Sequence, residues 1–172
     1  MADLSEPRVI AVGGPTASGK TALSVALAKT FDGEIINADS MQLYKGLDIG
    51  TAKPSPEEQQ GIPHHLLDFL PPETAYSVAD FTAAADPLIR EISGRGRLPF
   101  VVGGTGLYIT SLLNGMSFAP EKTDPAIRAR LQAQADAGDG AALYARLQQI
   151  DPDYAAIVHP NNLPRVIRAL EL

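Results

Sequence analysis

The sequence contains no cysteine and no tryptophan among its 172 residues. Without cysteine, a disulfide scaffold and a thiolate metal site are both excluded. No apolar run approaches the roughly 20 residues that a membrane-spanning helix requires, so we expect no membrane partner. The N-terminus lacks a charged segment followed by an apolar one, which favours a cytoplasmic protein over a secreted one.

Positive charge is also scarce. The 14 Lys and Arg residues are outnumbered by 20 Asp and Glu, which gives a formal net charge of −6. Affinity for nucleic acid usually comes from Lys and Arg, so this balance argues mildly against an RNA-binding surface. The hydrophobic fraction of 45% and the charged fraction of 20% are ordinary for a soluble globular protein. The length suits one domain with a helical appendage.

The apolar pattern predicts strands that alternate with helices over the first part of the chain. Short β-branched runs predict buried parallel strands, and longer periodic runs predict helices. The expected strands are 8–12, 34–38, 64–70 and 98–102, and the expected helices are 21–31, 78–93 and 106–113. The polar stretch 41–61 is expected to be a loop with a short helical turn. This alternation predicts an α/β fold with a mostly parallel sheet flanked by helices on both faces.

The pattern changes after residue 119. Asp124-Pro125 and Asp151-Pro152 each place a helix cap before a proline at the first helical position. The expected short helices are 125–137, 141–149 and 152–158. We therefore expect an α/β core at 1–119, a helical lobe at 120–160, and at 161–172 the start of a helix that returns to the core. That helix stops without a C-terminal signal, so we expect the chain to be a fragment.

One motif, Gly14-Pro15-Thr16-Ala17-Ser18-Gly19-Lys20-Thr21, satisfies G-x-x-x-x-G-K-[ST] between an expected strand and an expected helix. The glycines let backbone N–H groups converge on an anion, and the helix N-terminus adds partial positive charge. Lys20 supplies a cation for terminal phosphate oxygens, and the Thr21 hydroxyl can ligate Mg²⁺. The motif therefore predicts a phosphate site at residues 14–21, with Mg²⁺ as cofactor at Thr21.

The acidic Mg²⁺ ligand of many phosphoryl-transfer enzymes is missing. The expected strand 98–102 is followed by Gly103-Gly104-Thr105-Gly106, without Asp or Glu, which disfavours an ATPase or GTPase. Asp39 instead follows the expected strand 34–38, at the edge where open α/β sheets bind ligands. Its carboxylate could orient a nucleophile or accept its proton, and a helix cap or an outer Mg²⁺ partner is an equal alternative.

Four further motifs follow the P-loop in order: Asp39-Ser40-Met41-Gln42-Leu43-Tyr44, Gly50-Thr51-Ala52-Lys53-Pro54, His64-His65-Leu66 and Val102-Gly103-Gly104-Thr105-Gly106-Leu107-Tyr108. Their order closely resembles that of the tRNA dimethylallyltransferases, also called tRNA isopentenyltransferases, over nearly the whole chain from Val9. The resemblance implies a P-loop NTPase-like fold. It also implies transfer of a dimethylallyl group from dimethylallyl diphosphate to N6 of the adenosine at tRNA position 37, just 3′ of the anticodon, with release of diphosphate. The implied partners are the tRNA anticodon stem-loop and dimethylallyl diphosphate, and we expect a monomer.

The resemblance also assigns roles to residues. Asp39 becomes the base that takes the N6 proton, and Thr105 helps to hold amine and diphosphate in line, unless Thr105 simply caps the next helix. The implied tRNA contacts are Asp39, Ser40, Met41 and Gln42, together with Pro164, Arg165, Val166, Ile167 and Arg168. Arg165 and Arg168 would share one helix face, which a solvated surface explains equally well. Lys53 is either a phosphate contact or an exposed loop lysine.

His64 and His65 invite a metal interpretation. Adjacent residues on a strand point to opposite faces and cannot easily chelate one ion, so we expect them to pack or hydrogen-bond near the phosphate site.

Three other functions remain open. One is a P-loop kinase for a nucleotide or small molecule, and another is an isopentenyltransferase that acts on free adenine nucleotides. The third is a non-catalytic fragment that binds phosphate and RNA. The helical lobe and the last helix favour a tRNA substrate. Members of the resembled family are longer, and their further residues include an Arg used at the diphosphate and many basic residues that face tRNA.

Overall fold

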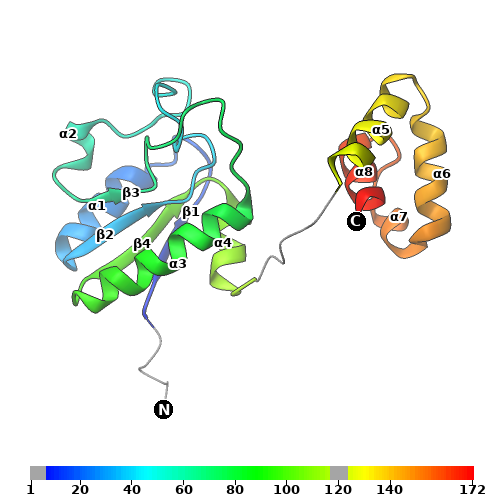
Figure 1. Ribbon diagram of the computed structural model, residues 1–172. Coiled ribbons are helices and arrows are strands. Elements are labelled where there is room, and N and C mark those ends of the chain that lie inside the picture. Colours follow the sequence, from blue (N-terminus) through cyan, green and yellow to red (C-terminus); the bar gives the residue numbers. More distant parts are fainter. Residues whose placement is uncertain (1–6, 117–123) are drawn as a thin grey trace, which may run out of the picture. The chain divides into compact units, whose positions relative to one another are not determined.

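The computed structural model describes residues 7–116 and 124–172, which form two compact units, one on either side of residues 117–123 (Figure 1). The first unit contains the sheet, and the second contains helices α5 to α8.

The sheet of the first unit has the strand order β1-β4-β2-β3, and every pairing is parallel. The strands are β1 (Ile10–Gly13), β2 (Gly33–Asn37), β3 (His64–His65) and β4 (Leu98–Gly103). Phe100 of β4 pairs with Ile10 on one side and with Ile35 on the other. Because β4 lies between β1 and β2, the carboxyl ends of these three strands meet at one edge. The P-loop, Asp39 and Thr105 all follow those ends.

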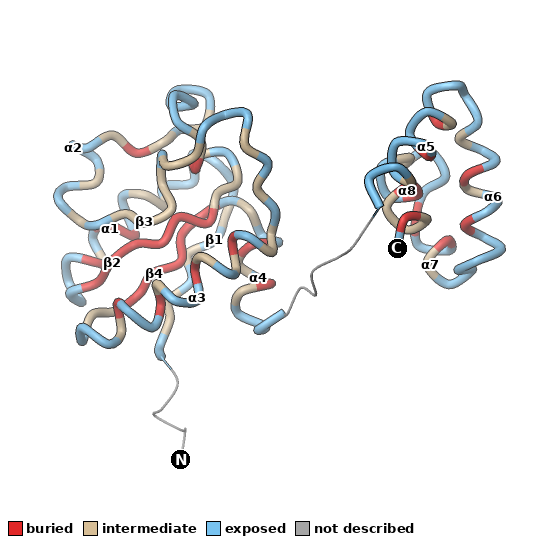
Figure 2. The backbone as a smooth tube through the Cα atoms, in the orientation of Figure 1, coloured by how far each residue is buried: buried red, intermediate tan, exposed pale blue. Residues whose placement is uncertain are grey.

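Helices cover both faces of this sheet (Figure 1). Helix α1 (Lys20–Thr30) packs on one face, and α3 (Val78–Gly94) and α4 (Gly106–Leu113) cover the other. Strand residues alternate between the faces, so Ile35 joins the α1 side and Ile36 joins the α3 side. Figure 2 shows β2 and β4 buried along most of their length, which matches the continuous apolar runs expected of central parallel strands. The predicted α/β fold with a parallel sheet is confirmed.

The helix boundaries follow local capping chemistry. The Ser77 hydroxyl accepts a hydrogen bond from the N–H of Asp80 at 3.2 Å, and the Asp80 carboxylate accepts from the N–H of Ser77 at 2.8 Å. This capping box starts α3 where the sequence predicted it. Ser55 and Glu58 form a second capping box on the short helix α2 (Pro56–Gln59), inside the stretch expected to be a loop with a helical turn.

The predicted strand 64–70 is wrong in its length. Only His64 and His65 form a ladder with β2, and Leu70 adds an isolated bridge to Tyr44. Leu66 and Asp68 adopt φ angles of 55° and 53°, in the left-handed region that ends a strand. The segment is fixed by contacts with distant residues, which a strand pattern in its own sequence does not reveal.

The second unit consists of α5 (Pro125–Asp136), α6 (Gly140–Ile150), α7 (Pro152–Ile157) and α8 (Leu163–Glu171). Asp124 and Asp151 cap α5 and α7 by accepting backbone N–H groups at 2.9 Å, as the two Asp-Pro pairs indicated. The core of this unit includes Leu131, Leu143, Leu147 and Ile167. Helix α8, which we expected to begin a return to the sheet domain, packs here against α5 and α6.

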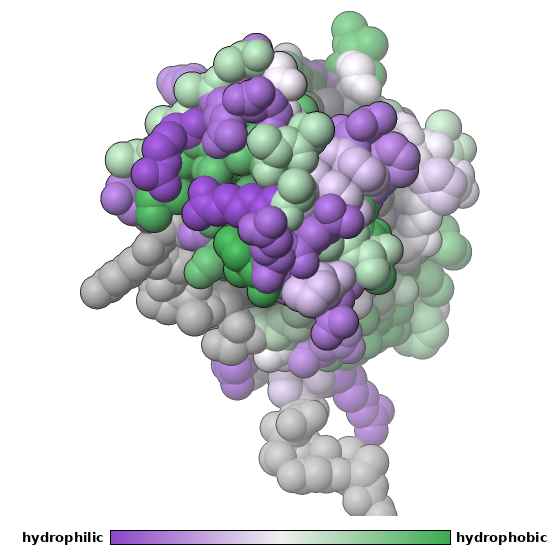
Figure 3. Space-filling view, turned by 90° about the vertical axis from the view of Figure 1, so that its right-hand side faces the viewer, coloured by the Kyte–Doolittle hydropathy of each residue, from purple (hydrophilic) through white to green (hydrophobic). Residues whose placement is uncertain are grey.

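The surface of the helical unit mixes residue types. Figure 3 shows hydrophilic and hydrophobic side chains interspersed over the face turned to the viewer. None of the described helices is both long enough and apolar enough to cross a bilayer.

Candidate active site

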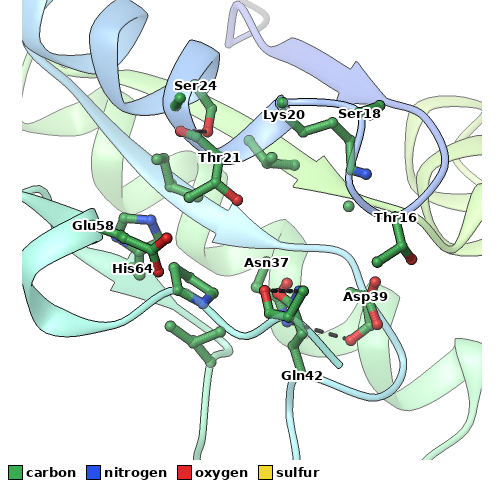
Figure 4. A pocket seen from close by; sticks show the side chains of 18 of the residues that line it. Thr16, Ser18, Lys20, Thr21, Ser24, Asn37, Asp39, Gln42, Glu58 and His64 are labelled. Atoms are coloured by element: carbon green, nitrogen blue, oxygen red, sulfur yellow. Dashed lines mark hydrogen bonds between the residues drawn. The ribbon is translucent and has the colours of Figure 1, made fainter. Parts of the chain in front are cut away.

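A cavity of about 340 Å³ lies at the carboxyl ends of β2 and β4, beside the first turn of α1 (Figure 4). Residues 16–21 of the P-loop line it, together with Asp39 and Gln42 from the segment after β2. Further walls come from segments that the P-loop motif does not include. They are Ala22, Ser24, Ile35, Asn37, Ala52, Pro54, Glu58, His64, Leu67, Val102 and Gly103. The cavity therefore joins a phosphate-binding loop to a carboxylate and to an apolar wall.

The loop between β1 and α1 has the backbone conformation of an anion-binding nest. Ala17 and Gly19 have φ angles of 62° and 83°, in the left-handed region that a residue with a side chain rarely adopts. Within the described chain, no N–H group of residues 14–19 donates to a backbone carbonyl. Free amides thus stand at the N-terminus of α1, where the helix dipole adds positive potential. This arrangement is suited to bind phosphate.

Lys20 and Thr21 supply the side chains of the phosphate site. The Lys20 Nζ donates to the carbonyl of Pro15 across the loop, and both residues line the cavity. Figure 4 shows Thr21 and Asp39 directed into the same space.

The oxygen atoms around the cavity fit a magnesium ion that is bound together with phosphate. Mg²⁺ usually takes one or two protein oxygens and completes its shell with substrate phosphates and water. The Thr21 hydroxyl and the Asn37 and Asp39 side chains line the cavity. Within residues 7–116 and 124–172, no cluster of three His, Cys, Asp or Glu side chains could hold a metal by itself. The residues thus suit Mg²⁺ held by Thr21 together with a bound phosphate group.

One oxygen of the Asp39 carboxylate accepts a hydrogen bond, and the other accepts none from the described residues. Oδ1 accepts the N–H of Met41 at 3.0 Å, which orients the carboxylate by an Asx-type turn. Oδ2 has no hydrogen-bond donor among the residues that the structure describes. Gly104 lies against it, because a Cβ atom at residue 104 would come within 3.2 Å of Oδ2. A carboxylate oxygen without a donor in the described chain therefore lies beside a residue without a side chain, on an aspartate that lines the cavity.

Thr105 holds the segment that carries Asp39. Its Oγ1 accepts the N–H of Ser40 at 2.9 Å, and its hydroxyl donates to Ser40 Oγ at 3.1 Å. Its own N–H donates to the carbonyl of Ala38 at 3.2 Å. The Thr105 side chain makes no capping hydrogen bond to α4, although it precedes that helix. The structure therefore favours a link between β2 and β4 over the alternative of a helix cap.

Asn37 is a wall residue that the sequence analysis missed. Its Nδ2 donates to the carbonyls of Leu66 at 2.9 Å and Asp39 at 3.3 Å, and so joins β2 to the segments on both sides of the cavity. Its signal in the sequence is a polar residue at the carboxyl end of a buried strand, which packing alone does not explain.

The adjacent histidines point to opposite faces of the sheet, as expected. His64 lines the cavity, and its Nδ1 bonds the carbonyl of Ile62 at 2.8 Å. Burial lowers the pKa of His64. On the other face, His65 Nε2 lies 2.6 Å from the buried carboxylate of Glu34, which also binds Arg95 and Arg97. The pair thus divides between the candidate site and a structural ion cluster.

Lys53 is neither an exposed loop lysine nor free to reach a phosphate, so both interpretations of it are wrong. Its side chain is only 6% exposed, and Nζ lies 2.7 Å from Asp48, 2.6 Å from Asp68 and 2.7 Å from the carbonyl of Tyr44. Burial by itself would lower the pKa of Lys53, but the two aspartates raise it. Lys53 therefore joins the loop before it to the segment after β3.

The second group of expected tRNA contacts lies on α8 in the helical unit. Val166 and Ile167 are buried in the core of that unit, and Pro164 and Arg165 are exposed. Arg168 is partly buried and hydrogen-bonds the carboxylate of Glu171. Of the five residues, the exposed Pro164 and Arg165 are thus the most accessible to a partner.

Comparisons with known proteins identify relatives of the whole described chain. A family model described as IPP transferase matches residues 42–172. The tRNA dimethylallyltransferase of Bacillus subtilis (strain 168) is 51% identical over all 172 residues, and that of Anaeromyxobacter dehalogenans (strain 2CP-C) is 54% identical over 96% of the chain. The chain spans about half the length of these curated relatives, 54% and 55% respectively.

Solved structures agree with these sequence comparisons. The tRNA isopentenylpyrophosphate transferase of Bacillus halodurans is 51% identical with a TM-score of 0.66, over 96% of this chain and 55% of that one. A eukaryotic dimethylallyltransferase acting on tRNA is 36% identical with a TM-score of 0.80, over 95% of this chain and 40% of that one. These neighbours support the P-loop NTPase-like fold.

Proposed function

The chain belongs to the IPP transferase family, and we propose that the protein transfers a dimethylallyl group from dimethylallyl diphosphate to N6 of adenosine 37 in tRNA. The observation that carries this proposal is one cavity lined both by the P-loop and by Asp39, whose Oδ2 has no donor within the described chain. A phosphate cradle beside an available carboxylate is the pair of groups that the reaction needs.

The P-loop stabilises the diphosphate leaving group. When the allylic carbon–oxygen bond breaks, its electron pair stays with the diphosphate, so negative charge grows on the leaving oxygens. The free amides at the start of α1 and the ammonium of Lys20 stabilise that charge. Thr21 would hold Mg²⁺ on the diphosphate, where the ion would neutralise charge as a Lewis acid.

Asp39 acts on the acceptor, the N6 amine of adenosine. The N6 nitrogen forms the new bond to carbon, and its proton passes to Oδ2 of Asp39. The base must leave its stack to reach this edge of the sheet, as in other enzymes that modify a nucleobase. Thr105 holds Ser40, and Asn37 holds the carbonyl of Asp39, so the carboxylate keeps its position beside the diphosphate.

Two groups of residues are proposed to contact tRNA. The first group is residues 39–42, of which Asp39 and Gln42 line the cavity. The second is on α8 of the helical unit, with the exposed Pro164 and Arg165 and the partly buried Arg168. Arg side chains at such positions would bind backbone phosphates and orient the anticodon stem-loop.

A transfer experiment tests the reaction. We would use a fusion protein in which residues 1–172 are followed by the remaining residues of the Bacillus subtilis relative. It is incubated with Mg²⁺, unmodified tRNA and labelled dimethylallyl diphosphate. The proposal expects label on the adenosine 3′ of the anticodon. Label on free AMP but not on tRNA would favour the free-nucleotide transferase, and phosphorylation from ATP without prenyl transfer would favour the kinase.

A further inference from the structure

Three exposed apolar side chains lie close together within residues 41–49, just after Asp39 in the chain. Ile49 is 98% exposed, Met41 is 49% exposed and Leu47 is 37% exposed. Together with Gly46 and Gly50 they line one shallow hollow of about 500 Å³. A single exposed apolar residue needs no explanation, but three that line one hollow indicate a contact surface. We call this hollow the Ile49 surface.

The loop that carries the Ile49 surface is cross-linked by its polar groups. The buried ammonium of Lys53 binds Asp48 and the carbonyl of Tyr44, and the N–H of Lys53 donates to the carbonyl of Asp48 at 3.1 Å. The Thr51 hydroxyl donates to the carbonyl of Leu47. The Lys53 ammonium and the Thr51 hydroxyl thus bind other groups of the loop, while apolar side chains are held outward. This is the reverse of the usual solvent-exposed loop.

The Ile49 surface adjoins the candidate active site through shared residues. The N–H of Met41 donates to Asp39 Oδ1 at 3.0 Å, so one apolar member of the surface is tied directly to the proposed base. Gln42 lines the phosphate cavity, and its Nε2 donates to the carbonyl of Thr51 at 3.0 Å in the loop. Residues 39–42 therefore contribute to both, since Asp39 and Gln42 line the cavity and Met41 lines the Ile49 surface.

The charge of the loop is compatible with a polyanionic partner. Its one carboxylate, Asp48, is paired with Lys53 at 2.7 Å, and the exposed Lys45 precedes the hollow. Asp48 also lines the hollow, but Lys53 balances its charge, so an RNA strand would meet apolar groups next to a lysine, without an unpaired acid.

We propose that Met41, Leu47 and Ile49 contact the nucleobases that flank the target adenosine. This proposal rests on the proposed function. An adenosine that enters the cavity at Asp39 leaves its neighbours without a stacking partner, and they emerge where the Ile49 surface begins. Leu, Ile and Met side chains are the kind that replace lost stacking by wedging against or between bases.

Binding measurements on the fusion protein test the contact. Ile49→Ser and Leu47→Ser change exposed side chains, and Phe31→Ser is the matched control, because Phe31 is 56% exposed beyond the C-terminal end of α1. The dissociation constant for an unmodified anticodon stem-loop should rise about tenfold in each loop variant. The control should bind the RNA as the wild type does, and pyrophosphate with Mg²⁺ should bind all four proteins equally.

A spectroscopic readout reports on the flanking base itself. With 2-aminopurine placed directly 3′ of the target adenosine, binding to the wild type should change the fluorescence, and Ile49→Ser should reduce that change. A probe in the stem should respond equally to both proteins.

A labelling experiment separates RNA from other occupants of the surface. The 172 residues contain no cysteine, so Ile49→Cys introduces one reactive thiol into this part of the fusion, whose remaining cysteines are replaced by serine. Rapid maleimide labelling that slows when the stem-loop is added would support the proposal. Slow labelling without RNA would show that another part of the protein covers Ile49, and would overturn it.

These experiments distinguish a failure of the Ile49 surface proposal from a failure of the proposed function on which it rests. If the wild-type fusion neither binds nor prenylates the RNA, both fall. If the wild type does both and the loop variants match it in binding and fluorescence, only the Ile49 surface loses its role.

Discussion

Thr105 and Ser40 are joined by two hydrogen bonds across the carboxyl ends of β4 and β2, at 2.9 Å to the backbone N–H of Ser40 and at 3.1 Å to its hydroxyl. The two residues are 65 positions apart in the chain. Their link fixes the segment that begins at Asp39 relative to the strand that passes between β1 and β2. The orientation of the proposed base thus depends on a hydroxyl group that follows a different strand.

Removing the Thr105 hydroxyl should slow catalysis more than it weakens folding. Thr105→Ala releases Ser40, and misplacing a catalytic group by about an ångström costs roughly a hundredfold, so we expect kcat to fall about tenfold to a hundredfold. Steady-state kinetics on the fusion protein give this value. Thr105→Ser keeps the hydroxyl and should retain most of the activity. Equal loss in both variants would show that the methyl group, not the hydrogen bonds, matters.

Adjacent glycines should respond differently to alanine. At Gly103 a Cβ atom would lie 2.1 Å from the carbonyl oxygen of Ala38, so Gly103→Ala should force the strands apart and destabilise the fold by about 3 kcal/mol or more. At Gly104 the same atom would meet only Asp39 Oδ2 at 3.2 Å and the carbonyl of Gly14 at 3.6 Å. Gly104→Ala should therefore fold normally but lower kcat, as shown by thermal melting and kinetics together. Full activity in Gly104→Ala would mean that Oδ2 does not act at this position.

Loss of the Lys53 ammonium should loosen the loop that carries Ile49. Lys53→Met leaves Asp48 and Asp68 without their shared cation, and because both aspartates are largely exposed, we expect a loss of about 1–3 kcal/mol. Hydrogen exchange should accelerate at the amides of residues 48–53. The exposed Lys29→Met serves as control and should change stability by less than about 0.5 kcal/mol. Unchanged exchange in Lys53→Met would contradict the anchoring role.

Stability in acid should depend on Glu34. Its side chain is only 5% exposed; burial by itself would raise its pKa, but hydrogen bonds from His65, Arg97 and Arg95 lower it from 4.5 to about 2. Because the pKa is lower in the folded state than in the unfolded chain, the ionised carboxylate stabilises the fold above about pH 4.5. This contribution is lost as the pH falls from about 4.5 towards 2.

Chemical unfolding of the wild type and of Glu34→Gln tests this. The substitution should lower the free energy of unfolding at pH 7 by about 1–3 kcal/mol, and the difference between the two proteins should shrink towards pH 3. If the difference in unfolding free energy stays constant with pH, Glu34 stabilises the fold through packing and not through its charge.

Much of the fold could be predicted because its signals are local. The capping box of Ser77 and Asp80 starts α3, and the Asp-Pro pairs start α5 and α7. The 8 residues of the P-loop motif specify the turn after β1 and the start of α1. Each of these signals acts within a few residues, so the sequence pattern and the structure agree.

The remainder depends on contacts between distant segments. The strand pattern of 64–70 ends early because Lys53 binds Asp68 and Asn37 binds the carbonyl of Leu66. The burial of Lys53, and the place of Asn37 in the cavity wall, follow from the same contacts. A sequence pattern shows that these residues are polar, but not which distant groups they meet. The proposed catalytic roles of Asp39 and Thr105 remain predictions. The structure shows where the two side chains lie and what they bind.

The most direct test of the central claim is the rate of prenyl transfer by Asp39→Asn, measured on fusion protein saturated with dimethylallyl diphosphate, Mg²⁺ and unmodified tRNA. Asparagine keeps the size and hydrogen-bond acceptor of Asp39 but cannot take the N6 proton. Our account predicts a rate lower by about 10² to 10⁴, with the affinity for dimethylallyl diphosphate unchanged, because the P-loop is intact. A rate close to that of the wild type would show that Asp39 is not the base, and would contradict the account.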